Sequence, residues 1–137
     1  MLLVRFRELV AAEFARRQGQ NPRYSLRGFA RLLGINHSTI SRLLKSTRPV
    51  PSRTVNALGP RLGLSAGRIA AIVADEDAAA LIHCIQRKTF RPDSRWLASA
   101  AGISIDRVNV ALQLLIRTRR LEMQSVSQWL VIESGNR

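Results

Sequence analysis

Hydrophobic residues recur at helical spacing in the first half of the chain, between polar residues that cap helices and glycines that end them. A first helix over residues 1–17 is predicted by a stripe of apolar positions: Leu2, Phe6, Leu9, Val10 and Phe14. Four more helices, ending near residues 33, 46, 62 and 74, are expected after N-cap residues: Ser25, Asn36, Ser52 and Ser65. Gly59 and Pro60 are expected to weaken or kink the fourth helix.

The second half of the chain predicts three helices and a β-hairpin. The helix over residues 77–88 has an apolar face: Ala80, Leu81, Cys84 and Ile85. Asp93 is expected to cap a short helix that ends at Gly102, and Ser104 a longer one that reaches residue 119. Alternating runs at residues 121–124 and 128–132 predict the hairpin, and residues 135–137 are expected to fray. The acidic residues 75–77 are the sharpest change in composition, so we expect two domains, 1–74 and 75–137.

Two segments of the chain align without gaps: FARLLGINHSTISRLL at residues 29–44 and LASAAGISIDRVNVAL at residues 97–112. In each, a small residue is followed four positions later by glycine, then by isoleucine, and later by a β-branched residue. This is the spacing of a helix-turn-helix, in which alanine lets two helices cross closely and glycine takes the positive φ of the turn. The match is stronger in the first copy, where Leu43 closes the pattern, than in the second, where Ala111 stands at that position.

The net charge of the chain indicates an anionic partner. The 137 residues include 22 Lys and Arg against 9 Asp and Glu, a formal net charge of +13. Residues 1–74 hold thirteen of these cations but only two acids, Glu8 and Glu13, so they carry +11, whereas residues 75–137 carry +2. A surface that binds a polyanion therefore belongs mainly to the first half. Most of the cations are arginines, which suit bidentate contacts to phosphate and guanine, although genome composition would give the same bias.

Both halves resemble known DNA-binding domains. Residues 1–74, with the run YSLRGFARLLGINHSTISRLL, resemble the phage-repressor or Xre type of helix-turn-helix domain, and residues 77–132 resemble a bacterial winged-helix domain. The order of the two domains resembles that in a family of bacterial regulators, in which a segment like NPRYSLRGFARLLG precedes a winged helix. In that family a further domain usually follows, and it would be missing here. The resemblance implies a mainly α fold: a five-helix repressor-like domain, then a winged-helix domain of three helices and a two-stranded β-hairpin.

The same resemblance makes residues 37–46 the recognition helix, whose leading residues would face base edges in the major groove. Polar side chains suited to reading bases occupy these positions: Asn36, His37, Ser38, Thr39, Ser41 and Arg42. Arg42 is the best candidate for a guanine contact. Four cations are expected to contact phosphates: Arg27, Lys45, Arg48 and Arg53. The alternative is a polar helix face that is only solvated.

The second copy of the repeat is a poorer reader of DNA. Asp106 would repel phosphate, Ile105 offers few polar contacts, and the turn at residues 125–128 contains no cation. Three residues could still follow a DNA backbone or contact a partner: Arg107, Asn109 and Arg117. We expect this domain to be a protein-contact surface, forming a homodimer through residues 75–137 with Val110 and Leu114 facing the second chain. An auxiliary DNA contact, or another protein partner, is the alternative.

Other chemistries find little support in the sequence. His37 and His83 lie near no cluster with metal-ligand spacing, and neither a glycine-rich phosphate loop nor a paired-carboxylate site occurs, so we expect no enzyme, no metal and no other cofactor. Cys84 is interpreted as a small core residue, with a redox-sensing thiol as the alternative. No uncharged apolar run approaches the roughly 18 residues that cross a bilayer, so no membrane partner is expected.

The sequence therefore predicts a sequence-specific double-stranded DNA-binding protein, a transcriptional regulator of the bacterial cytoplasm that lies on the nucleoid when bound. Two alternatives stay open. One is an adaptor or assembly protein whose helix-turn-helix folds mainly contact other proteins. The other is a non-catalytic DNA-targeting subunit of a recombination or mobile-element system.

Overall fold

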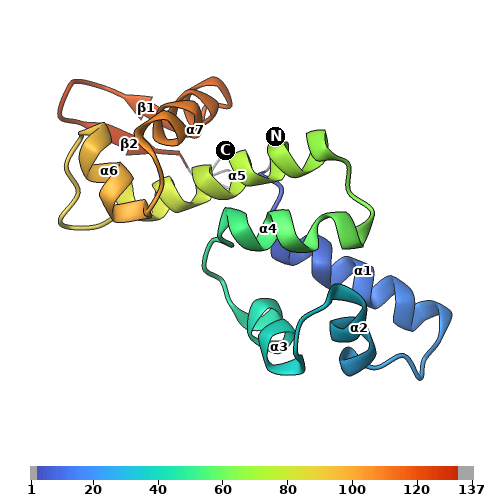
Figure 1. The fold of residues 1–137 in the computed structure, drawn as a ribbon. Coiled ribbons are helices and arrows are strands. Elements are labelled where there is room, and N and C mark those ends of the chain that lie inside the picture. Colours follow the sequence, from blue (N-terminus) through green and yellow to red (C-terminus); the bar gives the residue numbers. More distant parts are fainter. Residues whose placement is uncertain (1–2, 133–137) are drawn as a thin grey trace. The chain divides into compact units, whose positions relative to one another are not determined.

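The computed structural model describes residues 3–132 and is mainly α-helical, as the sequence predicts (Figure 1). These residues contain seven α-helices, one 3₁₀ helix and a two-stranded antiparallel sheet. They form two compact units: residues 4–73, and residues 74–132 together with Leu3. Predictions for Leu2 and for residues 135–137 fall outside this range.

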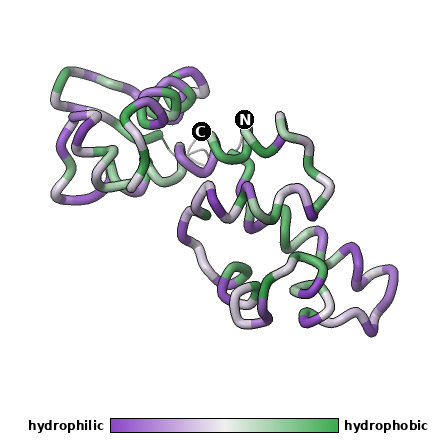
Figure 2. Tube along the Cα trace, viewed as in Figure 1, coloured by the Kyte–Doolittle hydropathy of each residue, from purple (hydrophilic) through white to green (hydrophobic). Residues whose placement is uncertain are grey.

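The first unit contains α1 (Phe6–Gln20), α2 (Leu26–Leu33), α3 (His37–Lys45), α4 (Ser52–Leu58), the 3₁₀ helix η1 (Pro60–Leu62) and the start of α5 (Ala66–Ile85). α1 and α2 both pack against α3. Figure 2 shows hydrophobic and hydrophilic residues mixed along these helices, and the hydrophobic ones supply a shared core. Four helices, α1 to α4, supply fully buried side chains to that core: Phe6, Val10, Phe29, Ile40 and Val55. The apolar stripe expected on the first helix therefore packs inward, with Phe6 and Val10 at its centre.

The ends of α1 and α4 differ from the sequence prediction. α1 continues through Gly19 to Gln20, because the following Asn21 and Pro22 provide the stop rather than the glycine. Ser52 is the first residue of α4 and caps nothing, since Pro51 holds the N-cap position and makes no side-chain hydrogen bond. Pro60 has no N–H to continue the α-helical hydrogen bonds, so α4 ends at Leu58 and the next residues form the tighter helix η1. η1 is followed by Gly63, which has φ 79°.

The largest difference is the single helix α5, which replaces the two helices predicted over residues 66–74 and 77–88. The acidic residues at its centre mark a change in composition, but neither glycine nor proline is present there to stop a helix. Two of them, Glu76 and Asp77, are buried. Because α5 supplies residues to both units, cutting the chain at residue 74 would sever a helix.

The second unit contains the remainder of α5, then α6 (Ser94–Ala101), α7 (Ile105–Arg117), β1 (Leu121–Met123) and β2 (Trp129–Val131). The strands pair with Leu121 opposite Val131 and Met123 opposite Trp129, as the two alternating runs predict. Fully buried side chains from three helices form its core: Leu81, Leu97, Val108 and Leu115. No single helix within residues 3–132 is long and apolar enough to cross a membrane, and α6 and α7 reach that threshold only as a pair bent by 103°.

Gly59 is packed so closely that a methyl group has no room. A Cβ there would lie 2.8 Å from the Ile69 side chain and 2.8 Å from the Val55 carbonyl oxygen. We expect Gly59→Ala to lower the free energy of unfolding by about 1–3 kcal/mol through overpacking. Gly67→Ala in α5 is the control, because a Cβ there would meet nothing within 4 Å. This substitution should raise the free energy of unfolding by less than about 1 kcal/mol. Urea unfolding of both variants tests this, and equal effects would contradict it.

Candidate nucleic-acid interface

The turn between α2 and α3 depends on Gly34. Gly34 takes the left-handed conformation, with φ 73°, and the Ile35 N–H donates to the Ala30 carbonyl at 3.0 Å. The Arg61 side chain lies over the turn and donates to the Leu32 carbonyl. A Cβ at position 34 would lie 3.2 Å from the Arg61 guanidinium carbon, so glycine is favoured by both conformation and space.

The second unit contains the same turn. Gly102 has φ 71° and the Ile103 N–H donates to the Ala98 carbonyl at 3.1 Å. Phe29 and Leu97 occupy corresponding buried positions in the two segments, as do Ile40 and Val108. The two segments of the sequence repeat thus have the same local structure.

α3 turns a polar face outward because its apolar residues face the core. Ile40 is fully buried and Leu43 and Leu44 are partly buried. The candidate base-reading side chains divide by exposure: Asn36, Ser38 and Arg42 are exposed, and His37, Thr39 and Ser41 are half-buried. Three of the six side chains are therefore open to solvent and three only partly so, and their role in reading bases stays a prediction.

Asn36 has a second role that limits what three of these side chains can offer. Its Oδ1 accepts hydrogen bonds from the Thr39 N–H at 2.8 Å, the Thr39 hydroxyl at 2.7 Å and the Ser38 hydroxyl at 2.8 Å. The cap satisfies a backbone N–H that the helix cannot satisfy itself. In this arrangement both hydroxyl groups donate within the cap, so Ser38 and Thr39 offer a partner their acceptor lone pairs unless the cap hydrogen bonds break. Arg42 carries the strongest free donor set of the six.

The cations around α3 are exposed and lie in a part of the chain without acids. The sequence has no Asp or Glu between Glu13 and Asp75. The four candidate phosphate contacts are all exposed: Arg27 on α2, Lys45 at the end of α3, Arg48 in the following loop and Arg53 on α4. Within residues 3–132 none of these four, nor Arg42, forms an ion pair. Their charge is therefore available to an anionic partner.

Arg16 and Arg17 on α1 are different, because they already share a carboxylate. Glu13 accepts from both arginines at 2.7 Å, and the hydrogen bond from Arg16, followed by the one from Arg17, lowers the pKa of Glu13 to about 2 against the opposing effect of burial. Glu13 thus neutralises only part of the charge of α1, whereas the four candidate phosphate contacts around α3 have no carboxylate partner in the described chain.

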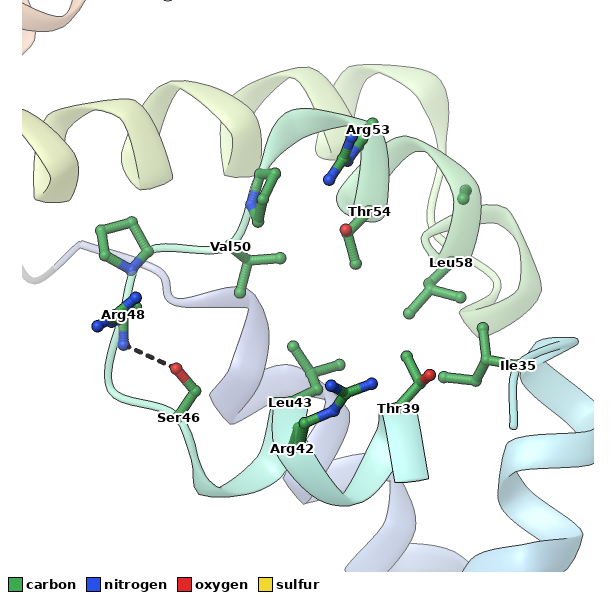
Figure 3. Close-up of a pocket in the computed structure, with 13 residues that line it drawn as sticks. Ile35, Thr39, Arg42, Leu43, Ser46, Arg48, Val50, Arg53, Thr54 and Leu58 are labelled. Atoms are coloured by element: carbon green, nitrogen blue, oxygen red, sulfur yellow. Dashed lines mark hydrogen bonds between the residues drawn. The ribbon is translucent and has the colours of Figure 1, made fainter. Parts of the chain in front are cut away.

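A pocket of about 540 Å³ opens between α3 and α4 (Figure 3). Its walls are mostly apolar, with Leu43, Val50 and Leu58 among them, and the loop at residues 46–51 closes one side. Arg42, Arg48 and Arg53 also line it, each from a different element. In Figure 3 the Arg42 side chain extends between Leu43 and Thr39 into the space that the other residues surround.

In the second unit, two of the three predicted contact residues are already engaged. Arg107 donates to both carboxylate oxygens of Asp77, at 2.9 and 2.6 Å, and the Asn109 carboxamide oxygen accepts from the Ser94 hydroxyl at 3.2 Å. The buried Asp77 on α5 requires a cation, so Arg107 could contact DNA or a partner only while sharing this pair, and that contact stays a prediction. Only Arg117 remains exposed without such a partner in the described chain. Sequence reasoning missed the pair because α5 and α7 are far apart in sequence.

The groups considered for other chemistry are placed as follows. Cys84 is buried, at 2% exposure, and burial raises the pKa of its thiol, which disfavours the reactive thiolate. Within residues 3–132 no group of three His, Cys, Asp or Glu side chains is placed to hold a metal ion.

Comparison with known proteins gives no match for this chain among family models, curated proteins or solved structures.

Proposed function

We propose that this protein binds double-stranded DNA in a sequence-specific way through α3 and acts as a transcriptional regulator in the bacterial cytoplasm. The observation that carries the proposal is the exposed polar face of α3 within a chain segment that has cations and no acids. An α-helix fits the major groove, where each base pair presents a distinct pattern of donors and acceptors. Arg42 would read a guanine, and the surrounding cations would bind phosphates.

The local architecture supports assigning both units to helix-turn-helix classes. α2 and α3 with their glycine turn correspond to a helix-turn-helix, and residues 1–74 to the repressor-like domain that contains it. α6 and α7 bend by 103° at their turn, within the range of about 90–120° for that motif, and the β1–β2 hairpin follows them as a wing does. Residues 75–137 would then be a winged-helix domain whose first helix is continuous with the preceding domain.

Selection of duplexes from a random library by the full chain tests sequence specificity. Repeated cycles of binding and amplification should enrich a short motif, and a pseudo-palindrome with half-sites one DNA turn apart is expected if two chains bind together. The chain with Arg42→Ala and Ser41→Ala serves as the control in a parallel selection, and should enrich the motif less. Recovery of DNA without any enriched motif would contradict specific reading.

The second unit supports a role in pairing chains rather than in reading DNA. Val110 on α7 is 59% exposed and Ile105 is 43% exposed, while Leu114 is partly buried in the unit's own core. Ile105 and Val110 lie about 140° apart around the α7 axis, whereas Val110 and Leu114 share one face. A second copy could therefore cover Val110 beside Leu114. The Arg107 pair with Asp77 leaves this helix with little cationic character at that end. The alternative of an adaptor protein would use the same surface for a different chain.

Val110→Glu is expected to shift the protein from dimer to monomer, because two such carboxylates would face an apolar partner surface. Gln20→Glu is the control, since it introduces the same charge at an exposed position of α1, outside the second unit. Sedimentation velocity at high micromolar concentration measures both. A wild-type chain that sediments as a monomer, free and on DNA, would contradict the homodimer.

A further inference from the structure

The pocket between α3 and α4 lies on the surface that the proposed function assigns to DNA, yet most of its walls cannot serve DNA. Leu43, Val50 and Leu58 provide apolar surface that a hydrated phosphate backbone would not cover favourably. Base contacts use few apolar groups beyond the thymine methyl. A pocket of about 540 Å³ is of the size that holds small organic molecules.

The charge around the pocket specifies the kind of molecule. Arg42 from α3, Arg48 from the loop and Arg53 from α4 surround the apolar walls, and no carboxylate is among the residues that line it. Within the described chain none of the three guanidinium groups has an ion-pair partner. Three uncompensated cations beside apolar walls fit a ligand with a hydrocarbon body and an anionic head, because the guanidinium fork binds carboxylate and phosphate oxygens in pairs.

We propose that this pocket binds a small amphipathic anion, with a carboxylate or phosphate head held by Arg42 and a hydrocarbon body against the apolar walls, and that its binding weakens the contact of α3 with DNA. The regulatory part rests on the proposed function. Arg42 links the two, since the same side chain lines the pocket and lies on the face that would read bases (Figure 3). A head group that holds the Arg42 guanidinium inside the pocket removes it from the DNA surface. Ligand and DNA therefore compete for one residue.

Calorimetric titration of the full chain without DNA tests the site by itself. Decanoate is the probe, used below the concentration at which it forms micelles, and decylammonium carries the same tail with a positive head. We expect one decanoate to bind per chain, and decylammonium to bind about tenfold more weakly or not at all, because the pocket is lined by arginine cations and by no carboxylate. Equal affinity for the two probes, or no saturable binding of decanoate, overturns the proposal.

A variant that fills the pocket separates it from general hydrophobic binding. Ala57 lines the pocket on α4 and is exposed, so Ala57→Phe should occupy the space and lower decanoate affinity about tenfold or more without changing charge. Ala70→Phe is the matched control, since Ala70 is exposed on α5 and does not line the pocket. Undiminished decanoate binding by Ala57→Phe, with native stability confirmed by circular dichroism, overturns the assignment of the site.

The regulatory part is measured by fluorescence anisotropy on the duplex obtained by selection. Saturating decanoate should weaken DNA binding about tenfold for the wild-type chain and leave Ala57→Phe unaffected. Decanoate that binds in the calorimeter but leaves DNA affinity unchanged overturns the competition while the site stands. If no duplex binds, the regulatory part falls together with the proposed function, and the calorimetric result still decides the pocket.

Discussion

Replacing Arg42 by alanine is expected to weaken binding to the preferred duplex by about 1–3 kcal/mol and to relax the preference at one or two base pairs. Arg42 lies in the second turn of α3, is exposed, and has no carboxylate partner in the described part of the chain. A bidentate contact to guanine would be lost, whereas the phosphate contacts would remain. Anisotropy titrations with the preferred and a scrambled duplex measure both the affinity and the preference.

Arg48→Ala and Arg53→Ala are the controls for this result. Both residues are exposed and lie beyond the C-terminal end of α3, one in the proline-rich loop and one in α4. Loss of a phosphate contact should weaken binding to all duplexes alike and lower the slope of log K against log salt by about one. An equal loss on both duplexes for Arg42→Ala would show that α3 is a general phosphate-binding helix and that Arg42 reads no base.

Replacing Arg107 by methionine is expected to lower the free energy of unfolding by about 1–3 kcal/mol. Asp77 would lose both of its hydrogen bonds from Arg107 while only 11% of its side chain is exposed, so its charge would be left nearly buried. The cost is smaller than for a fully buried pair because Arg107 is 36% exposed. Urea unfolding followed by circular dichroism measures it.

Two further variants show whether the pair is the cause. Asp77→Ala combined with Arg107→Met removes both charges and should recover part of the lost stability. Asp106→Asn changes an exposed acid next to Arg107 and should have little effect. DNA affinity should be unchanged in Arg107→Met when the protein is folded, because Arg107 is held within its own unit. A double variant as unstable as Arg107→Met would contradict the pair as the cause.

Local signals in the sequence predicted the elements that build the candidate site. Ser25, Asn36, Asp93 and Ser104 accept the N-cap hydrogen bonds expected of them, and Gly34 and Gly102 take the left-handed conformation. These features depend on a few neighbouring residues, so they can be recognised without knowing the fold. The polar face of α3 followed from the same pattern.

Features that depend on distant residues could not be predicted in this way. The ion pair of Asp77 with Arg107 joins residues 30 positions apart, and it makes a buried acid acceptable in the middle of α5. Without it, the acidic stretch resembled a boundary between helices. The pocket between α3 and α4 likewise depends on how the loop at residues 46–51 packs, which periodicity does not specify. The hydrogen bonds from the Ser38 and Thr39 hydroxyls to Asn36 compete with base reading, and the spacing of these residues in the sequence does not show that they form.

The measurement that tests the central claim most directly is the salt dependence of duplex binding by the full chain. Anisotropy titrations between about 50 and 200 mM salt should give a log–log slope near −4 to −5, as expected when about five phosphates are neutralised by the exposed cations around α3. Weaker binding to a scrambled duplex at every salt concentration would also support sequence-specific recognition. Absence of duplex binding at the lowest salt concentration, or a slope near zero, would contradict the account.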